Sequence, residues 1–221
     1  MSKKHTERGF DRVVNFSDAV VAIAITLLVL PLIDLLNDES KNMDFFQFLQ
    51  EHMDSILAFA IAFLALAGYW RLHHQLFELL DGYNGVLIRL NTLWLMVVVL
   101  LPFLSASLPL TGTGATLFVF LLAIAVLSIL LGAMSAYARS RPGLLAPHAE
   151  RSDFNTRRFW WFAIFEICIA LFALWWANLG NDGDKVALAL LLLLPLGWLS
   201  EWSHRRAVAR SADPAPTRAT D

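Results

Sequence analysis

Polar residues with a spacing suited to chemistry open the first long apolar run of the chain. Arg12, Ser17 and Asp18 stand there, ahead of an almost unbroken aliphatic sequence that reaches Pro31. A polar or ionisable group inside a bilayer is costly and by default indicates a functional site. Ser and Asp are also ordinary residues for the first turn of a helix, where they cap it and favour its dipole. Taken alone, the spacing favours this capping interpretation.

A second polar group lies where the next two apolar runs meet. His73 and His74 come at the end of the second run, and Asn91 comes at the beginning of the third. These three residues are expected at the same depth as Ser17 and Asp18, for which they can supply hydrogen-bond partners. A network of this kind would position the first helix and could respond to pH. The alternative is that one or both histidines lie in the loop, and His73 is the stronger candidate for the network.

Glu166 is a carboxyl group within the fifth apolar run, roughly 10 Å from its beginning by helical rise. Two interpretations are open. The residue could bind a proton or a cation, or it could pair with a basic residue such as Arg157 or Arg158. Pairing is the favoured one, because a buried charge needs a partner.

These residues do not make an enzyme site. The chain has a single cysteine, Cys168. It has no pair of histidines one turn apart within a run, no second carboxylate cluster and no nucleophile beside a base. We therefore expect no enzymatic activity, no catalytic residue, no metal and no cofactor. The net charge of −2 also does not suggest a nucleic-acid partner.

The elements that hold these residues are membrane-spanning helices. The 221 residues are 57% hydrophobic and 16% charged, whereas soluble domains average about 45–50% apolar and about 25% charged residues. Apolar runs long enough to cross a bilayer recur along the chain, and all are expected to be helical because a helix satisfies its own backbone in lipid. They are Val13 to Ile33, Ser55 to Leu72, Val86 to Ser107, Ala115 to Ala138, Phe159 to Leu179 and Val186 to Trp202. The sequence thus predicts an all-α integral membrane protein with six spans.

The connections between the runs alternate in charge. All of the 17 basic residues except Lys41 and Lys185 lie at the termini or in the second and fourth connections. Because basic loops stay in the cytoplasm, both termini are predicted to be cytoplasmic. Residues 1–206 form the predicted membrane domain, and 207–221, with Pro214 and Pro216, form a predicted disordered cytoplasmic tail.

The first connection contains aromatic residues that could lie on the membrane surface. Phe45, Phe46, Phe48 and Leu49 precede the second span. They would form either an amphipathic turn on the outer surface or a loop that packs on the spans.

The first span carries one apolar stripe. At 100° per residue, Ile23, Leu27 and Leu30 fall within about 60° of one another, and Thr26 lies at the edge of the stripe. Asp18 points roughly 140° away from Ile23, toward neighbouring helices. From periodicity alone, such a stripe is more typical of helix packing than of a pore wall.

A longer sequence pattern favours a pore wall over helix packing. The string Arg12-x-x-x-Phe16-Ser17-Asp18, followed by the aliphatic stretch Ala22 to Leu30, resembles the signature of the transmembrane protein 175 family of potassium channels. Tyr69-Trp70, His73-His74 and Phe77, with Asn91, Trp94-Leu95 and Leu101-Pro102-Phe103, resemble the family's second and third helices. The resemblance covers roughly residues 8–105.

The resemblance implies six-helix subunits around a central pore lined by the first helix. It implies a homotetramer, because bacterial members have one such repeat and this chain shows no second one. It places the pore constriction at Ile23, Thr26, Leu27 and Leu30. Arg12, Phe16, Ser17, Asp18, His73 and Asn91 become a network that positions the pore helix. Pro31 departs from the family pattern, and its missing N–H predicts a kink at the outer end of that helix.

The resulting prediction is a potassium-preferring cation channel in the cell's inner membrane, with potassium ions and membrane lipid as its partners. The sequence contains no Thr-Val-Gly-Tyr-Gly-like filter, so selectivity is expected to come from dehydration at stacked aliphatic rings. Proton permeation and a non-enzymatic accessory subunit are the alternatives.

Overall fold

The described part of the chain is a bundle of long helices. The computed structural model describes residues 4–39, 44–111, 114–151, 153–154 and 156–179. Apart from an isolated bridge between Leu80 and Leu145, the regular elements in these ranges are helical. They are α1 (Lys4–Leu27), α2 (Leu30–Glu39), α3 (Phe45–Glu51), α4 (Met53–Glu78), α5 (Gly85–Thr111), α6 (Gly114–Arg139), the 3₁₀ turn η2 (Pro142–Leu144) and α7 (Thr156–Asn178).

Five helical stretches in these ranges are long and apolar enough to cross a membrane. They are Gly9–Leu36, Met53–Glu78, Gly85–Leu108, Gly114–Arg139 and Thr156–Trp176. Each contains or overlaps one of the first five predicted spans, so the all-α membrane fold is confirmed. The sixth predicted span, Val186 to Trp202, and the predicted tail, 207–221, lie outside the described residues.

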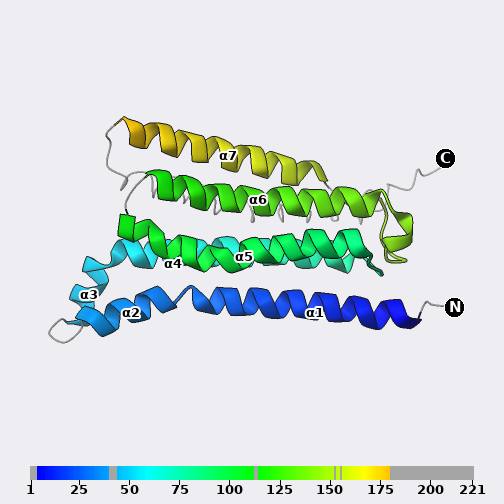
Figure 1. The fold of residues 1–221 in the computed structure, drawn as a ribbon, viewed down its shortest axis with the longest axis horizontal. Coiled ribbons are helices and arrows are strands. Elements are labelled where there is room, and N and C mark those ends of the chain that lie inside the picture. Colours follow the sequence, from blue (N-terminus) through cyan, green and yellow to red (C-terminus); the bar gives the residue numbers. More distant parts are fainter. Residues whose placement is uncertain (1–3, 40–43, 112–113, 152, 155, 180–221) are drawn as a thin grey trace, which may run out of the picture.

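Consecutive spans run antiparallel and stack side by side (Figure 1). The α1 helix packs against α4 and α5, α5 packs against α6, and α6 packs against α7. Large side chains fill the interior, among them the fully buried Trp94, Phe120 and Phe159. Because of this order of packing, α1 lies at one side of the described bundle and α7 lies at the other.

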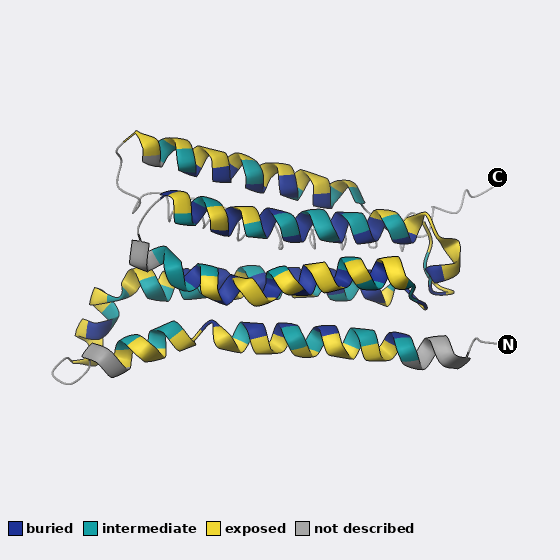
Figure 2. Ribbon diagram, viewed as in Figure 1, coloured by how far each residue is buried: buried dark blue, intermediate teal, exposed yellow. Residues whose placement is uncertain are grey.

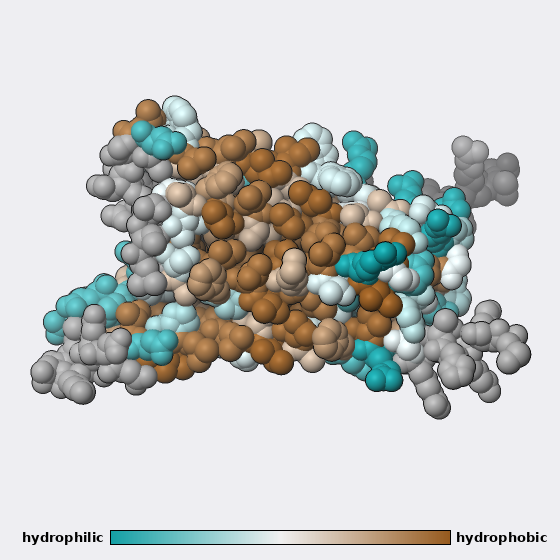
Figure 3. Space-filling view, in the orientation of Figure 1, coloured by the Kyte–Doolittle hydropathy of each residue, from teal (hydrophilic) through white to brown (hydrophobic). Residues whose placement is uncertain are grey.

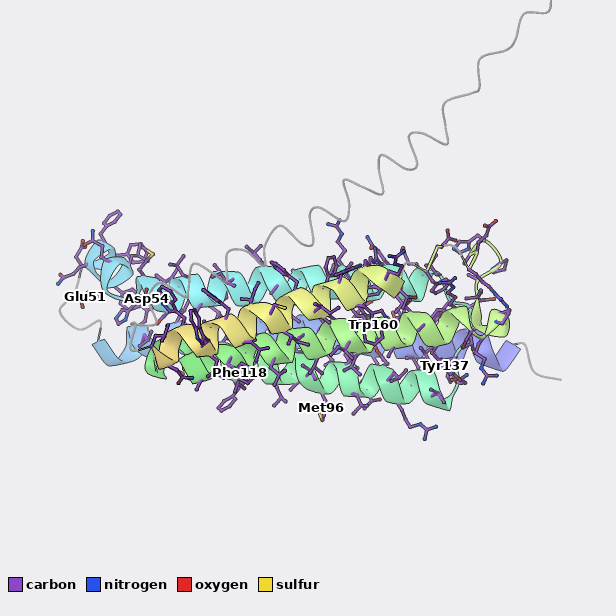
Figure 4. The ribbon with its side chains drawn as sticks, turned by 90° about the horizontal axis from the view of Figure 1, so that it is seen from above. Glu51, Asp54, Met96, Phe118, Tyr137 and Trp160 are labelled. Atoms are coloured by element: carbon purple, nitrogen blue, oxygen red, sulfur yellow. The ribbon has the colours of Figure 1, made fainter. Side chains whose placement is uncertain are left out.

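The outside of the bundle is apolar over its middle. Figure 3 shows a broad hydrophobic band with hydrophilic residues gathered toward the two ends. Large apolar side chains such as Leu100 and Leu171 are exposed within this band, and Met96 projects away from the helices (Figure 4). A surface of this kind is stable against lipid, in agreement with the multi-pass membrane fold.

Two contacts explain how neighbouring spans meet. A Cβ atom on Gly132 would lie 3.2 Å from Cβ of Phe159, so the glycine lets α6 and α7 approach closely. At the interface between α5 and α6, Asn84 caps α5, since its Oδ1 accepts hydrogen bonds from the N–H groups of Val86 and Leu87 at 3.1 Å each. The Nδ2 atom of Asn84 donates to Tyr137 Oη at 2.9 Å and so ties the beginning of α5 to the end of α6.

The aromatic segment before the second span forms the short helix α3. Phe45 and Phe46 are exposed, whereas Phe48 is buried and its ring lies 4.5 Å from the ring of His52. One side of the segment is thus buried and the other is open, and its place on the membrane surface stays a prediction.

Candidate functional site

The predicted constriction residues lie on an exposed face of α1 and α2. The exposed fractions of Ile23, Leu27 and Leu30 are 59%, 38% and 47%, and Thr26 is exposed as well. The opposite face of α1 is buried, with Val21 and Ala24 at 1%. Figure 2 shows this division along the coloured part of α1, with its buried side toward the bundle. The helical period thus leaves an apolar stripe with no partner within the described chain.

Thr26 uses its hydroxyl proton within its own helix. Its Oγ1 donates to the carbonyl oxygen of Ile23 at 2.8 Å. This local bond orients the side chain, and the hydroxyl oxygen keeps its lone pairs for other contacts. An exposed oxygen atom therefore lies beside the aliphatic stripe.

The stripe is interrupted by a break in the helix. α1 ends at Leu27 and α2 begins at Leu30, with a turn at Leu28 and Val29. Pro31 has no N–H to donate to the carbonyl of Leu27, and the N–H groups of Leu32 and Ile33 both bond to the carbonyl of Val29. The predicted kink at Pro31 is confirmed. It separates Leu30 from Ile23 and Leu27.

A chain of hydrogen bonds fastens the buried side of α1 to α5 and α4. Ser17 is fully buried, and its Oγ accepts a hydrogen bond from Nδ2 of Asn91 at 2.8 Å. The Oγ of Ser17 itself donates to the carbonyl of Val13 at 2.8 Å. At the other end of the chain, Oδ1 of Asn91 lies 2.8 Å from Nε2 of His73. Three predicted network residues are thus brought together from three helices.

Asp18 makes a separate contact with α4. Its Oδ1 accepts a hydrogen bond from Nε1 of Trp70 at 2.9 Å. The helical arithmetic had directed Asp18 toward neighbouring helices, and it does point there. Its partner is an indole rather than the predicted histidine or asparagine. Trp70 belongs to the motif that resembles the family, but sequence reasoning had given it no role.

Arg12 and Phe16 do not join this network within the described chain. Both lie on the exposed side of α1, and Phe16 has an exposed fraction of 63%. They are on the same side as the aliphatic stripe because the helical period places them there. The motif groups them with Ser17, and their part in positioning the helix stays a prediction.

The two adjacent histidines have different surroundings. His73 is buried, and its ring stacks between Phe77 at 4.2 Å and Trp94 at 4.3 Å. His74 has a side chain that is 40% exposed, and its Nε2 lies 3.3 Å from Oε1 of Glu78. The open choice between them is thereby decided in favour of His73, while His74 lies at the surface.

Glu166 does not contact the arginines that the sequence suggested. It is 3% exposed, and its two carboxyl oxygens lie within hydrogen-bond distance of the hydroxyls of Tyr69 and Ser128. Arg158 instead places its guanidinium group 4.7 Å from the centre of the Phe159 ring. The expected ion pair is corrected to a polar contact among α4, α6 and α7. Its members are far apart in the sequence, and hydropathy does not reveal which faces of three helices meet.

The described residues also show no group of three or more His, Cys, Asp or Glu side chains that could hold a metal ion. Fold and site together define a class of protein. It is an all-α, multi-pass membrane protein whose first span is fastened to the bundle by hydrogen bonds on one side and, on the other, bears an apolar stripe that is exposed in the part of the chain that the structure describes.

Comparisons with known proteins identify the family within this class. A model of the family described as "Endosomal/lysosomal potassium channel TMEM175" matches residues 12–102. A potassium channel of Chamaesiphon minutus is 32% identical over 150 residues, which cover 64% of this chain and 72% of the relative. The chain therefore belongs to the TMEM175 family, and the resemblance found in the sequence is confirmed.

Other relatives share shorter parts of their length with this chain. The human endosomal/lysosomal proton channel TMEM175 is 30% identical over 146 residues, covering 64% of this chain and 28% of that protein. The chain thus spans a little over a quarter of this human relative. A potassium channel of Streptomyces collinus is 37% identical over 97 residues, covering 44% of this chain and 46% of the relative.

The fold is also found in a solved structure. The crystal structure of a lysosomal potassium-selective channel TMEM175 homolog from Chamaesiphon minutus matches with a TM-score of 0.69 at 22% identity. The match covers 87% of this chain and 98% of that one. It supports the all-helical architecture.

Proposed function

We propose that this chain is the pore-forming subunit of a potassium-preferring cation channel. In this proposal α1 lines a central pore, and Ile23, Thr26, Leu27 and Leu30 form its constriction. The observation that supports this proposal is the exposed stripe on α1. The opposite side of the helix is fastened by the hydrogen bonds of Ser17 and Asp18. A helix held in this way presents the same face in every subunit.

The composition of this face favours a pore over a lipid contact. Arg12, Asn15 and Thr26 are exposed along it, together with Asp34 beyond the break. Polar and charged side chains are costly against lipid, but they are stable beside water and ions. On α5, by contrast, the exposed side chains from Leu93 to Phe103 are all apolar.

Several copies are needed to close a pore around such a face. We propose a homotetramer in the bacterial plasma membrane, as the family resemblance implies, with membrane lipid around it. The end of the bundle that carries Arg71, Arg89, Arg139 and Arg157 would face the cytoplasm by the positive-inside rule, which puts the N-terminus on that side. A cytoplasmic C-terminus follows from the predicted sixth span.

The proposed selectivity comes from dehydration. Rings of aliphatic side chains offer no oxygen ligands, so an ion that passes them must shed part of its hydration shell. Potassium is less strongly hydrated than sodium and loses less on passing. The exposed Thr26 hydroxyls supply oxygen atoms beside the rings, and such a constriction discriminates only modestly.

Ion flux from liposomes tests the proposal. Purified protein is reconstituted and loaded with potassium or, separately, with sodium, and a proton ionophore with a dye reports the flux. Potassium flux should exceed sodium flux. Leu27→Ser should raise total flux and reduce the potassium preference, because a polar side chain wets the constriction. Leu171→Ser is the matched control, since Leu171 is an exposed leucine on α7, at the far side of the bundle.

Unchanged flux and selectivity in Leu27→Ser would contradict the assignment of this stripe to the pore. Absence of flux for both ions, from protein shown to be tetrameric, would contradict the passive channel and favour an accessory role.

Proton permeation is a second candidate function. It is favoured by the human relative, which is named a proton channel, and by the chain of hydrogen bonds from His73 through Asn91 to Ser17. Acid-driven flux that persists without potassium would support it. Loss of that flux in His73→Gln would place the histidine in the path.

A further inference from the structure

Three oxygen-bearing side chains meet inside the bundle, away from α1. They are Tyr69 on α4, Ser128 on α6 and Glu166 on α7, and all are buried. The Tyr69 hydroxyl contacts Oε1 of Glu166 and lies 2.5 Å from Oγ of Ser128. The Ser128 Oγ in turn lies 2.8 Å from Oε2 of Glu166. We call this closed set of three contacts the 69–128–166 ring.

A count of protons defines the state of the ring. Each of its three contacts joins two oxygen atoms and needs one proton to be attractive. The hydroxyls of Tyr69 and Ser128 supply two. If Glu166 were ionised, both would donate to the carboxylate, and the Tyr69 and Ser128 oxygens would face each other at 2.5 Å without a proton of their own.

We infer that Glu166 is a proton-binding site that holds its proton in the native protein. The protonated carboxyl donates to Ser128, Ser128 donates to Tyr69, and Tyr69 donates to the other carboxyl oxygen. Each group then donates once and accepts once, so that no buried donor or acceptor is left unpaired.

The surroundings of Glu166 support this state. Tyr69 is the titratable group that faces it from α4, and from α6 it meets the uncharged Ser128. On α7 itself, the nearest cations in the described chain are Arg158 and Arg157. They precede Glu166 by about 12 Å or more along the helix axis. An ionised carboxyl at this place would be a buried charge with no cation in contact among the described residues, which is costly in a membrane.

The ring shares one turn of α4 with the contacts that hold α1. Tyr69 belongs to the ring, the next residue, Trp70, donates to Asp18, and His73 reaches Asn91. The proton on Glu166 thus helps to hold α4 between the outer helices and α1. This inference concerns the bundle of one subunit and does not rest on the proposed channel.

Infrared spectroscopy of the reconstituted full chain tests the inference directly. A protonated carboxyl has a C=O stretching band that an ionised carboxylate lacks. At neutral pH, the wild type should show this band and Glu166→Gln should not. Tyr69→Phe removes the donor to the C=O oxygen, so the band should persist and move to higher frequency. Glu78→Gln is the matched control, because the Glu78 side chain is 66% exposed, and it should leave the band unchanged.

Stability gives a second, independent measurement. Glutamine has the shape of a protonated glutamate and can both donate and accept in the ring, so Glu166→Gln should retain the thermal midpoint at neutral pH, whereas Glu166→Ala should lose several degrees. The native state holds a proton that the unfolded chain releases at neutral pH. Stability should therefore fall as the pH rises in the wild type, and less so in Glu166→Gln.

Absence of the carboxyl band from the wild type at neutral pH would overturn the inference. So would a frequency that Tyr69→Phe leaves unchanged. Should Glu166→Gln fail to fold, the wild-type band and its shift in Tyr69→Phe still decide the question.

Discussion

The side chains of Asn91 and Ser17 form the central link between α5 and α1, with Nδ2 of Asn91 donating to Oγ of Ser17 at 2.8 Å. The amide oxygen of the same residue is engaged by His73. One buried asparagine thus satisfies polar groups on two neighbouring helices. Because an unpaired buried polar group is costly, this link fixes how α1 is rotated relative to the bundle.

Removal of this link should destabilise the subunit. Asn91→Leu leaves Nε2 of His73 without its partner, at a cost of about 1–3 kcal/mol for a buried group, and it also removes the hydrogen bond that Ser17 accepts. The thermal midpoint of the purified protein should fall by several degrees. Thr92→Ala is the matched control, because Thr92 is exposed and bonds only within its own helix, to the carbonyl of Ile88. Equal stability of the two variants would show that the link contributes little.

The contact between Trp70 and Asp18 should affect flux more than stability. Trp70 is partly exposed, and a hydrogen bond at such a place contributes about 1 kcal/mol. Trp70→Phe keeps the ring but removes the donor, so that the first turns of α1 are held less firmly. We expect a small change in the thermal midpoint and a clear change in liposome flux. Trp161→Phe, on the exposed side of α7, is the control and should behave like the wild type.

The close approach of α6 and α7 predicts opposite effects at two glycines. Gly132→Ala places a Cβ atom 3.2 Å from Cβ of Phe159, so Phe159 on α7 must shift by a few tenths of an ångström. Gly68→Ala meets nothing within 4 Å and gains helix propensity. The thermal midpoint should fall in the first variant and hold or rise in the second. A midpoint that is equal in both would mean that the α6 and α7 helices repack without cost.

Hydropathy and helical period were sufficient for much of this architecture. The first five spans follow from the length of the apolar runs, and the direction of Asp18, roughly 140° away from Ile23, follows from 100° per residue. The break before α2 follows from the missing N–H of Pro31. Each of these features depends on residues close together in the sequence.

Contacts between distant helices were harder to predict. Glu166 was expected to pair with Arg157 or Arg158 on its own helix, whereas its partners are Tyr69 and Ser128. Which faces of α4, α6 and α7 meet depends on side-chain packing across the whole bundle, which periodicity in one helix does not encode. Trp70 was missed for the same reason, since nothing near it in the sequence points to Asp18.

Pro31 gives the most direct test of how the exposed stripe works. The proline separates α1 from α2, so that Leu30 lies in a different helix from Ile23 and Leu27. Pro31→Ala restores an N–H group that can bond to the carbonyl of Leu27, and a proline within a helix costs about 3 kcal/mol. The two helices should then join, and the helical signal in circular dichroism should increase.

The joined helix makes a prediction for flux. Leu30 would then lie on one continuous helix with Ile23 and Leu27, within about 60° of both, which makes the aliphatic stripe longer and unbroken. A longer dry constriction raises the dehydration barrier, so total flux should fall and the preference for potassium over sodium should increase. Pro102→Ala, at a buried proline within α5, is the control for a proline replaced away from the stripe. Higher helicity with unchanged flux and selectivity in Pro31→Ala would show that Leu30 takes no part in the constriction.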